Sequence, residues 1–321
     1  MALPRSSSLL TKTVLAVVST LIAVVAAEAL ARLIGSGPTF GQRIFVREVP
    51  TRTVDGVALW SDEHPRTDAE DLRRAAADRA AFTILGLGDS IMYGVRVAKQ
   101  DTYLEQTRRA LEGRAKQRIE ILNLAVPGFN TMQENAVHKE IEDRVQPNLV
   151  LVHYFGGDDA HQYRVVGGYV VDFGNVSDDG RLVVRALPLP PRVSDFLLVH
   201  SRLYDLLTQL VMSRRLPEPT DWTRVSGPLS AIDDRAKRAG GRLLVLASPD
   251  LGGVAPQPIV DLPLLRQFAA TRGIEVIDLR EWLAGVDVRQ IALDSCHFNA
   301  EGHRLIGERL AEYLLERDLK P

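Results

Sequence analysis

The residues of this chain best suited to covalent chemistry are Ser90, Asp294 and His297. A serine hydroxyl attacks a carbonyl carbon well only when a base takes its proton, and the base works best when an acid orients it. These residues supply a nucleophile, an acid and a base. Asp294 and His297 are three residues apart, so a helical turn would place them on one face. The pattern indicates acyl-transfer chemistry at Ser90.

Each segment taken alone has a simpler structural interpretation. Gly88-Asp89-Ser90 after an apolar run is also typical of a turn that caps a helix. Asp294 before His297 fits a capped helix start, and Asp158-Asp159 fits a solvated loop. What favours a functional site is that these segments follow one another at the ends of successive predicted strands.

The surrounding pattern predicts an α/β fold with a parallel sheet covered on both faces. Short apolar runs alternate with segments of helical character. The expected strands lie within 81–90, 119–128, 149–159, 242–250 and 274–279, and the expected helices at 102–115, 132–144, before Gly240, 262–272 and 300–317. Ligands bind beyond the carboxyl ends of such strands. Three of those ends carry glycine and polar residues, at 88–90, 127–130 and 156–159, and 294–297 opens the last helix.

A middle segment, at about 167–219, departs from this alternation and is interpreted as an insertion near the site. It carries Asp179-Gly180, a hairpin signal, and the chain-breaking sequence LPLPP. From Ser194 to Arg214 the pattern predicts one amphipathic helix, whose apolar face suits core or lid packing.

The N-terminus predicts export. Residues 13–27 are apolar, and with the run continued through Ala31 the segment is long enough to cross a bilayer, which takes roughly 20 residues. Arg5 and Lys12 precede it. Two interpretations remain open: a signal peptide cleaved near Ala27-Glu28-Ala29, or an uncleaved anchor. We favour the anchor, with 1–34 as the membrane segment, 35–80 as a stalk and lead-in, and 81–321 as the main domain.

Composition and motif checks argue against several other functions. The net charge of −2 gives no electrostatic support for a nucleic-acid partner. The single Cys296 rules out an intramolecular disulfide and a four-cysteine zinc site. Ile91 stands where a dinucleotide fingerprint needs its third glycine. Met92 likewise interrupts a Gly-x-Ser-x-Gly elbow. The histidine spacings match no zinc motif, so we predict neither a metal nor a cofactor.

Four blocks together resemble the GDSL/SGNH-hydrolase superfamily, over about residues 82–315. The blocks are ILGLGDSIMYG, NLAVPGFNT, VLVHYFGGDD and DSCHFNAEGHRLIGERL. The resemblance implies a three-layer α/β/α, flavodoxin-like sandwich without metal, with Ser90 as nucleophile and Asp294 and His297 as its partners. It also implies an oxyanion hole built from the backbone N–H groups of Ser90 and Gly128. The apolar N-terminus is similar to that of membrane-tethered bacterial members, some linked to acetylation of surface polysaccharides.

The third block departs from the family pattern. It usually ends in Gly-x-Asn-Asp, whose asparagine donates to the oxyanion, whereas here Asp158 takes that place, or Gly157 in a register shifted by one. A carboxylate about 4 Å from an oxyanion would cost about 4 kcal/mol at an effective dielectric near 20. Loss of one oxyanion donor costs roughly 3 to 4 kcal/mol. By sequence, Asn123 and Asn130 are nearby substitutes.

The sequence therefore predicts an exported, membrane-tethered serine esterase or O-acyltransferase acting on ester-linked acyl groups of a carbohydrate or a lipid. The alternative is a catalytically weak or inactive member of the same fold that serves in binding or assembly. The expected partners are an ester substrate and the membrane, with no nucleic acid. The catalytic domain is expected outside the cytoplasm, either at the cell membrane or secreted after cleavage of the leader.

Overall fold

The chain forms two compact units, which are described separately. The computed structural model describes residues 6–35, 39, 51–60, 64–159, 163–166, 169–172, 187–213, 222–259 and 261–319. Unit 1 comprises Met1–Val49 and Tyr163–Glu218, and unit 2 comprises Pro50–Gln162 and Pro219–Pro321. The segment predicted as an insertion, 167–219, thus falls almost wholly in unit 1.

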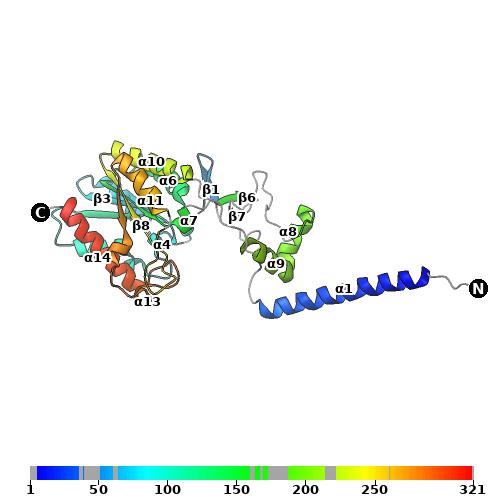
Figure 1. Cartoon of the computed structure of the whole chain (residues 1–321). Helices are drawn as coiled ribbons and strands as arrows, with labels where there is room; N and C mark the ends of the chain where they lie inside the picture. Colours follow the sequence, from blue (N-terminus) through cyan, green and yellow to red (C-terminus); the bar gives the residue numbers. More distant parts are fainter. Residues whose placement is uncertain are drawn as a thin grey trace, which may run out of the picture. The chain divides into compact units, whose positions relative to one another are not determined.

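A five-stranded parallel sheet organises unit 2 (Figure 1). Its strands are β3 (Phe82–Leu87), β4 (Ile119–Asn123), β5 (Leu149–Tyr154), β8 (Arg242–Ala247) and β9 (Glu275–Asp278), in the spatial order β4-β3-β5-β8-β9. Counted along the chain, this is the 2-1-3-4-5 order of flavodoxin-like folds. Strands β3 and β5 are buried along their whole length because both faces of the sheet are covered. The predicted fold class is confirmed.

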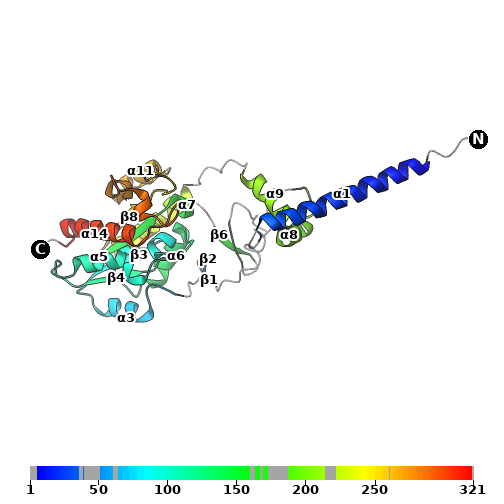
Figure 2. The ribbon, with the colours of Figure 1, turned by 90° about the horizontal axis from the view of Figure 1, so that it is seen from below.

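Helices cover both faces of the sheet and form two buried clusters. One face carries α6 (Thr131–Ile141), α10 (Thr223–Arg238) and α11 (Leu262–Arg272); the other carries α5 (Tyr103–Leu111) and α14 (Ala300–Arg317), which lie side by side (Figure 2). Successive strand residues such as Ile84 and Leu85 belong to opposite clusters. Gly307 lets α14 approach α5 closely, since a Cβ there would lie 2.7 Å from the Tyr103 carbonyl oxygen.

The described lead-in residues pack within unit 2. Strands β1 (Thr51–Val54) and β2 (Val57–Trp60) form an antiparallel hairpin that contacts α6 and buries Leu59 completely. Helix α3 (Ala69–Ala77) is capped at its start by Asp68, which forms a reciprocal capping box with Asp71. The remaining short elements of this unit are α4 (Ser90–Tyr93), η1 (Lys99–Asp101), α7 (Gly156–Asp159), α12 (Leu279–Trp282) and α13 (Val288–Ile291).

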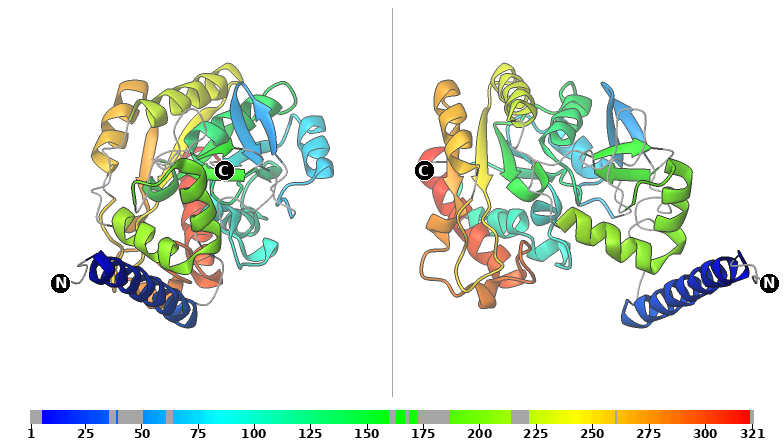
Figure 3. Two further views of the ribbon diagram at one scale, coloured as in Figure 1. Left: turned by 90° about the vertical axis from the view of Figure 1, so that its right-hand side faces the viewer. Right: turned by 45° about the vertical axis from the view of Figure 1, so that its right-hand side comes forward.

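Unit 1 contains the long apolar helix α1 (Ser6–Ile34) together with α8 (Pro191–His200) and α9 (Arg202–Ser213) (Figure 3). Within α1, residues Leu10–Ile34 contain an 18-residue window with a mean hydropathy of 2.4, of which only 6% is buried. Their length and composition suffice to cross a membrane, although a signal sequence would share both properties.

One detail of the middle segment differs from the sequence-based expectation. The helix predicted over 194–214 is two helices, because Ser201 is extended (φ −109°, ψ 116°) and its hydroxyl accepts the N–H of Tyr204 at the start of α9. The structure forms a hairpin from β6 (Tyr163–Val166) and β7 (Tyr169–Asp172). The hairpin predicted at Asp179-Gly180 lies outside the described residues.

Candidate active site

Ser90 lies at the carboxyl end of β3, where the chain turns sharply into α4. Asp89 precedes it, and its buried carboxylate caps the helix by accepting the N–H of Ile91 at 2.7 Å. Position 88 needs a glycine because neighbouring side chains approach its backbone closely. A Cβ there would lie 2.8 Å from Met92 Cβ and 3.2 Å from His153 Cβ. These contacts place the Ser90 hydroxyl at the edge of the sheet where parallel α/β folds bind ligands.

Asp294 and His297 lie in a tight loop that ends before α14 begins. The loop is closed by a hydrogen bond from Leu293 N to His297 O (2.8 Å) and by a bridge between Ala292 and Phe298. The helical turn expected for 294–297 is therefore wrong. Asp294 Oδ1 accepts the backbone N–H groups of Cys296 (3.1 Å) and His297 (2.9 Å), so a side-chain turn brings the pair together instead.

Ser90, His297 and Asp294 form one continuous chain of hydrogen bonds. His297 Nε2 lies 2.8 Å from Ser90 Oγ, and His297 Nδ1 lies 2.8 and 2.9 Å from the two carboxylate oxygens of Asp294. Partial burial alone raises the pKa of Asp294. The N–H groups of His297 and Cys296 and the imidazole outweigh this effect and hold that pKa well below its ordinary value. An ionised acid, an imidazole and a hydroxyl are thus aligned for proton transfer.

The backbone N–H groups of Ser90 and Gly128 stay the predicted oxyanion donors. Ser90 is the first residue of α4, where helix geometry leaves the N–H without a helical partner. Gly128 adopts φ 77° in the loop after β4, and this loop is fastened to β3 by Val126 N to Gly88 O at 3.0 Å. Within the described part of the chain, neither N–H donates a hydrogen bond that would keep it from a substrate oxygen.

The other residues that the sequence suggested for the oxyanion hole are Asp158, Asn123 and Asn130. The Asp158 side chain lies outside what the structure describes, so its role stays a prediction. Asp159 is buried and accepts Thr131 Oγ1 at 2.6 Å and Phe155 N at 2.7 Å, which makes it a structural link. The Asn123 amide already donates to Met92 O, and the Asn130 oxygen caps α6.

Several supporting residues gave no recognisable signal in the sequence. Arg66, in the segment interpreted as a stalk, stacks on Tyr93 and donates hydrogen bonds of 2.9 Å to the carbonyls of Tyr93, Gly94 and Val97. It thereby fixes the loop behind Ser90. Arg96 lies 3.8 Å from Asp294. Neither arginine has a distinctive spacing in the sequence, so only the folded chain identifies them.

Two further histidines are buried behind the site and act structurally. His303 Nδ1 accepts the backbone N–H of Tyr103 at 3.1 Å, and Tyr103 OH lies 3.0 Å from His153 Nδ1. Burial lowers the pKa of His303 to about 4 and that of His153 to about 3, so both are neutral near pH 7. They pack the helices that hold the loop of Asp294 and His297.

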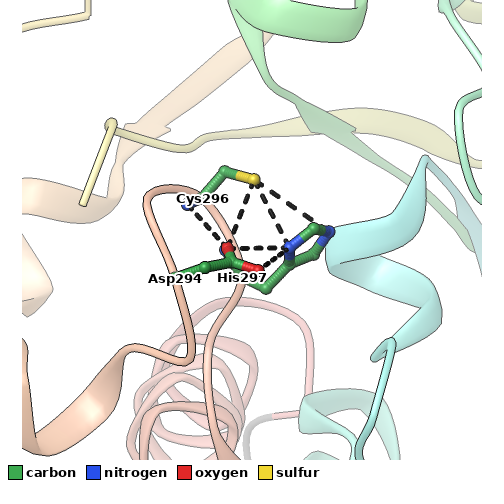
Figure 4. A group of neighbouring side chains, drawn as sticks. All are labelled: Asp294, Cys296 and His297. Atoms are coloured by element: carbon green, nitrogen blue, oxygen red, sulfur yellow. Dashed lines mark hydrogen bonds and ion pairs between the residues drawn. The ribbon is translucent and has the colours of Figure 1, made fainter. Parts of the chain in front are cut away.

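Three neighbouring donors could be considered for a metal: Asp294, Cys296 and His297 (Figure 4). The Cys296 sulfur lies 3.4 Å from His297 Nδ1 and 3.6 Å from Asp294 Oδ1. A cation there would need the Nδ1 lone pair. In the tautomer that donates Nδ1–H to Asp294, Nδ1 has no lone pair to offer a cation. The geometry therefore suits hydrogen bonding between base and acid better than ligation.

Comparison with known proteins places this chain in a family. The model of the GDSL-like lipase/acylhydrolase family matches residues 87–305, which include Ser90, Asp294 and His297. A search of curated proteins found no match.

Solved structures of similar fold include three esterases or acylhydrolases. They are an acetyl xylan esterase (12% identity, 72% of this chain and 99% of that one, TM-score 0.44), a two-domain esterase active on acetylated mannans (15%, 78% and 53%, 0.46) and a putative acylhydrolase from Bacteroides fragilis (13%, 79% and 98%, 0.45). With TM-scores below 0.5, these likenesses carry no argument about this chain. The family match over most of the chain carries the assignment: this protein belongs to the GDSL-like lipase/acylhydrolase family.

Proposed function

We propose that this family member is a serine ester hydrolase or O-acyltransferase with Ser90 as its nucleophile. The observation that carries the proposal is the hydrogen-bonded chain from Ser90 through His297 to Asp294, which joins residues 207 positions apart in sequence. A nucleophile within reach of a base, and a base held by an acid, is the arrangement that acyl transfer needs.

The proposed reaction has two half-reactions. Ser90 Oγ bonds to the acyl carbon while its proton passes to His297 Nε2. The resulting oxyanion accepts hydrogen bonds from Ser90 N–H and Gly128 N–H. The bond to the leaving alcohol then breaks, and the alcohol takes the proton from His297. In the second half, water or an acceptor hydroxyl gives its proton to His297 and attacks the acyl-enzyme, and Ser90 regains a proton when it leaves. Asp294 stays ionised throughout and fixes the imidazole.

Hydrolysis and transfer use the same residues in this scheme and differ only in the molecule that resolves the acyl-enzyme. The proposed substrates are ester-linked acyl groups of a carbohydrate or a lipid, as in the tethered family members that the N-terminus resembles. We propose that α1 anchors the chain and that unit 2 lies outside the cytoplasm. Membrane-bound mature protein that begins before residue 13 would support the anchor, whereas soluble protein beginning near Leu30 would show cleavage.

One observation favours a rival, non-catalytic role. In the simplest register of the third block, Asp158 takes the place where the family has an amide donor, and a carboxylate there would oppose an oxyanion. The rival, a weak or inactive member that serves in binding or assembly, predicts little or no ester turnover by the wild-type protein.

The decisive comparison measures hydrolysis of small acetyl esters by wild type, Ser90→Ala, His297→Ala and the matched control Ser295→Ala. Ser295 sits on the same loop as His297, and its side chain is exposed. Loss of nucleophile or base should lower kcat by at least a thousandfold, while Ser295→Ala should stay near wild type. Asp294→Asn should also lower kcat, but by less than Ser90→Ala or His297→Ala, because the nucleophile remains. Turnover by Ser90→Ala near the wild-type rate would refute the proposal.

A further inference from the structure

Helices α8 and α9 have an inverted distribution of polar and apolar side chains. Besides Leu198 and Tyr204, their buried positions hold the polar residues Ser194, Asp205 and Thr208, all three with no exposed surface. Their exposed positions are largely apolar: Val193, Phe196, Leu206, Leu207 and Leu210. A soluble helix pair buries its apolar face instead, so the outer surface of this pair suits an apolar environment rather than water.

The buried polar groups are paired with one another inside the unit. Arg202 Nη1 lies 2.8 Å from Asp205, and Thr208 Oγ1 donates to Tyr204 O at 2.9 Å. The hydroxyls of Ser194 and Tyr204 also share a hydrogen bond. Polar groups can leave water at acceptable cost when they are satisfied internally in this way.

The end of α1 holds the corner between α8 and α9. Glu28 accepts hydrogen bonds from Ser201 Oγ (2.8 Å), Arg202 N (3.0 Å) and Leu203 N (2.9 Å), and so caps the start of α9. Arg32 pairs with Glu28 at 2.7 Å and donates to His200 O, also at 2.7 Å, at the end of α8. Backbone groups that would be unpaired in a lipid environment therefore have partners.

The position of Glu28 along α1 sets the depth of this corner. It lies six residues before the end of the helix at Ile34, which corresponds to about 9 Å. A span that starts near Leu10 would therefore place Glu28, and the corner it holds, close to the boundary between acyl chains and headgroups. Ionisable residues at that depth are expected to be paired, as Glu28 is.

We propose that α8 and α9 form a second membrane contact beside α1, with the apolar face of Val193, Phe196, Leu206, Leu207 and Leu210 seated in the lipid interface. This inference rests on the proposed anchoring role of α1. Continuity with α1, and polar groups turned inward, select lipid as the occupant rather than another protein. The proposal also assigns a structural role to Glu28. Cleavage of the chain near Ala29 would remove Glu28 and with it this role.

The test uses the full chain in phosphatidylcholine vesicles, with or without bromine on the acyl chains, and single added tryptophans as probes. Leu206→Trp probes α9, and Leu264→Trp is the matched control, because the two leucines are 40% and 41% exposed and Leu264 lies on α11 of unit 2. Leu21→Trp reports insertion of α1. We expect brominated lipid to quench the added fluorescence at positions 21 and 206 and to leave position 264 unchanged.

The outcomes separate this inference from the proposed anchor. Quenching at 21 with none at 206 would leave the anchor standing and overturn the interfacial role of α9. Absence of quenching at 21 would reject the anchor and the inference together. Equal quenching at 264 would contradict a contact confined to α8 and α9. Phe196→Trp, an aromatic replacement on exposed α8, gives a second probe that should be quenched even if Leu206→Trp fails to fold.

A second measurement tests the role of Glu28 in the same vesicles. Glu28→Leu removes the acceptors for Arg202 N–H and Leu203 N–H, and Glu28→Gln keeps one oxygen. Amide hydrogen exchange at 202 and 203 should accelerate strongly in Glu28→Leu and less in Glu28→Gln. Unchanged exchange in both variants would show that Glu28 does not hold the α8–α9 corner.

Discussion

At the level of single residues, the carboxylate of Asp294 combines two tasks. It shapes its own loop by accepting two backbone N–H groups, and it binds the imidazole that faces Ser90. Because the same bonds hold its pKa low, the acid is ionised across the neutral range and keeps Nδ1 of His297 as the hydrogen-bond donor. The loop and the proposed base are thus positioned by one side chain.

Asp158 offers the sharpest prediction at this scale. If its carboxylate occupies the oxyanion-donor position, Asp158→Asn replaces a repulsive charge with a donor. The kcat for a small acetyl ester at neutral pH should then rise about tenfold or more, which requires recovery of only part of a roughly 3 kcal/mol donor contribution. Steady-state kinetics with a small ester and with a larger acylated carbohydrate would measure this effect.

The structure decides which control suits that experiment. Asp159→Asn is unsuitable because Asp159 is buried and accepts two hydrogen bonds, so its loss should destabilise the fold by about 1 to 3 kcal/mol. Asp143→Asn changes the same charge at an exposed position. A fall in activity with both esters for Asp158→Asn alone would mean that Asp158 is itself needed for the reaction.

The sequence predicted which residue types would meet, but not all of the means by which they meet. Ser90, His297 and Asp294 were identifiable because their order and their positions at strand ends are distinctive. The loop that joins Asp294 to His297 was not, since a separation of three residues fits a helical turn equally well. The hydrogen bond from the Asn123 side-chain amide to Met92 O joins residues distant in sequence, so no local pattern reveals it.

At the level of elements, the loop behind Ser90 depends on one guanidinium. Arg66→Ala would remove three hydrogen bonds to the carbonyls of Tyr93, Gly94 and Val97. We expect a lower melting temperature and a lower kcat/KM for a small ester, because α4 would lose its support. Arg66→Lys should restore little, since an ammonium lacks the planar fork of donors. Thermal melts and kinetics would measure both effects.

The matched control for Arg66 is Arg73→Ala, which removes the same charge from an exposed position on α3. Equal effects of the two substitutions would mean that charge, and not the three hydrogen bonds, matters at residue 66.

Prediction of the elements succeeded where local signals agree with the tertiary structure. Helices 262–272 and 300–317 were predicted with the observed bounds, because a proline or asparagine marks each start and apolar spacing is regular. The break between α8 and α9 was missed because apolar spacing continues across Ser201. The lead-in was assigned to a stalk because its charges hide the hairpin that packs Leu59 against the unit.

At the level of the whole molecule, buried neutral histidines make stability depend on pH. Burial lowers the pKa of His138 and His153 to about 3 and that of His303 to about 4. Between pH 6.5 and 4 the unfolded chain therefore binds more protons than the folded chain, and the free energy of unfolding must fall as pH falls. His303 alone contributes on the order of 3 kcal/mol over this window.

Urea unfolding followed by tryptophan fluorescence at several pH values would measure this decline. His303→Asn provides the comparison, because its side-chain oxygen can still accept the Tyr103 N–H while it does not titrate. Its stability should depend less steeply on pH than that of wild type. Identical slopes for the two proteins would show that folding does not lower the pKa of His303.

The most direct test of the central claim is covalent labelling with a fluorophosphonate, followed by peptide mass spectrometry. The phosphonyl group bonds only to an activated serine, so the account predicts one adduct, on Ser90, in wild type and in Ser295→Ala. It predicts none in Ser90→Ala or His297→Ala, each checked for an unchanged fold by circular dichroism. An adduct on another serine, or none on correctly folded wild type, would contradict the assignment of Ser90 as the nucleophile.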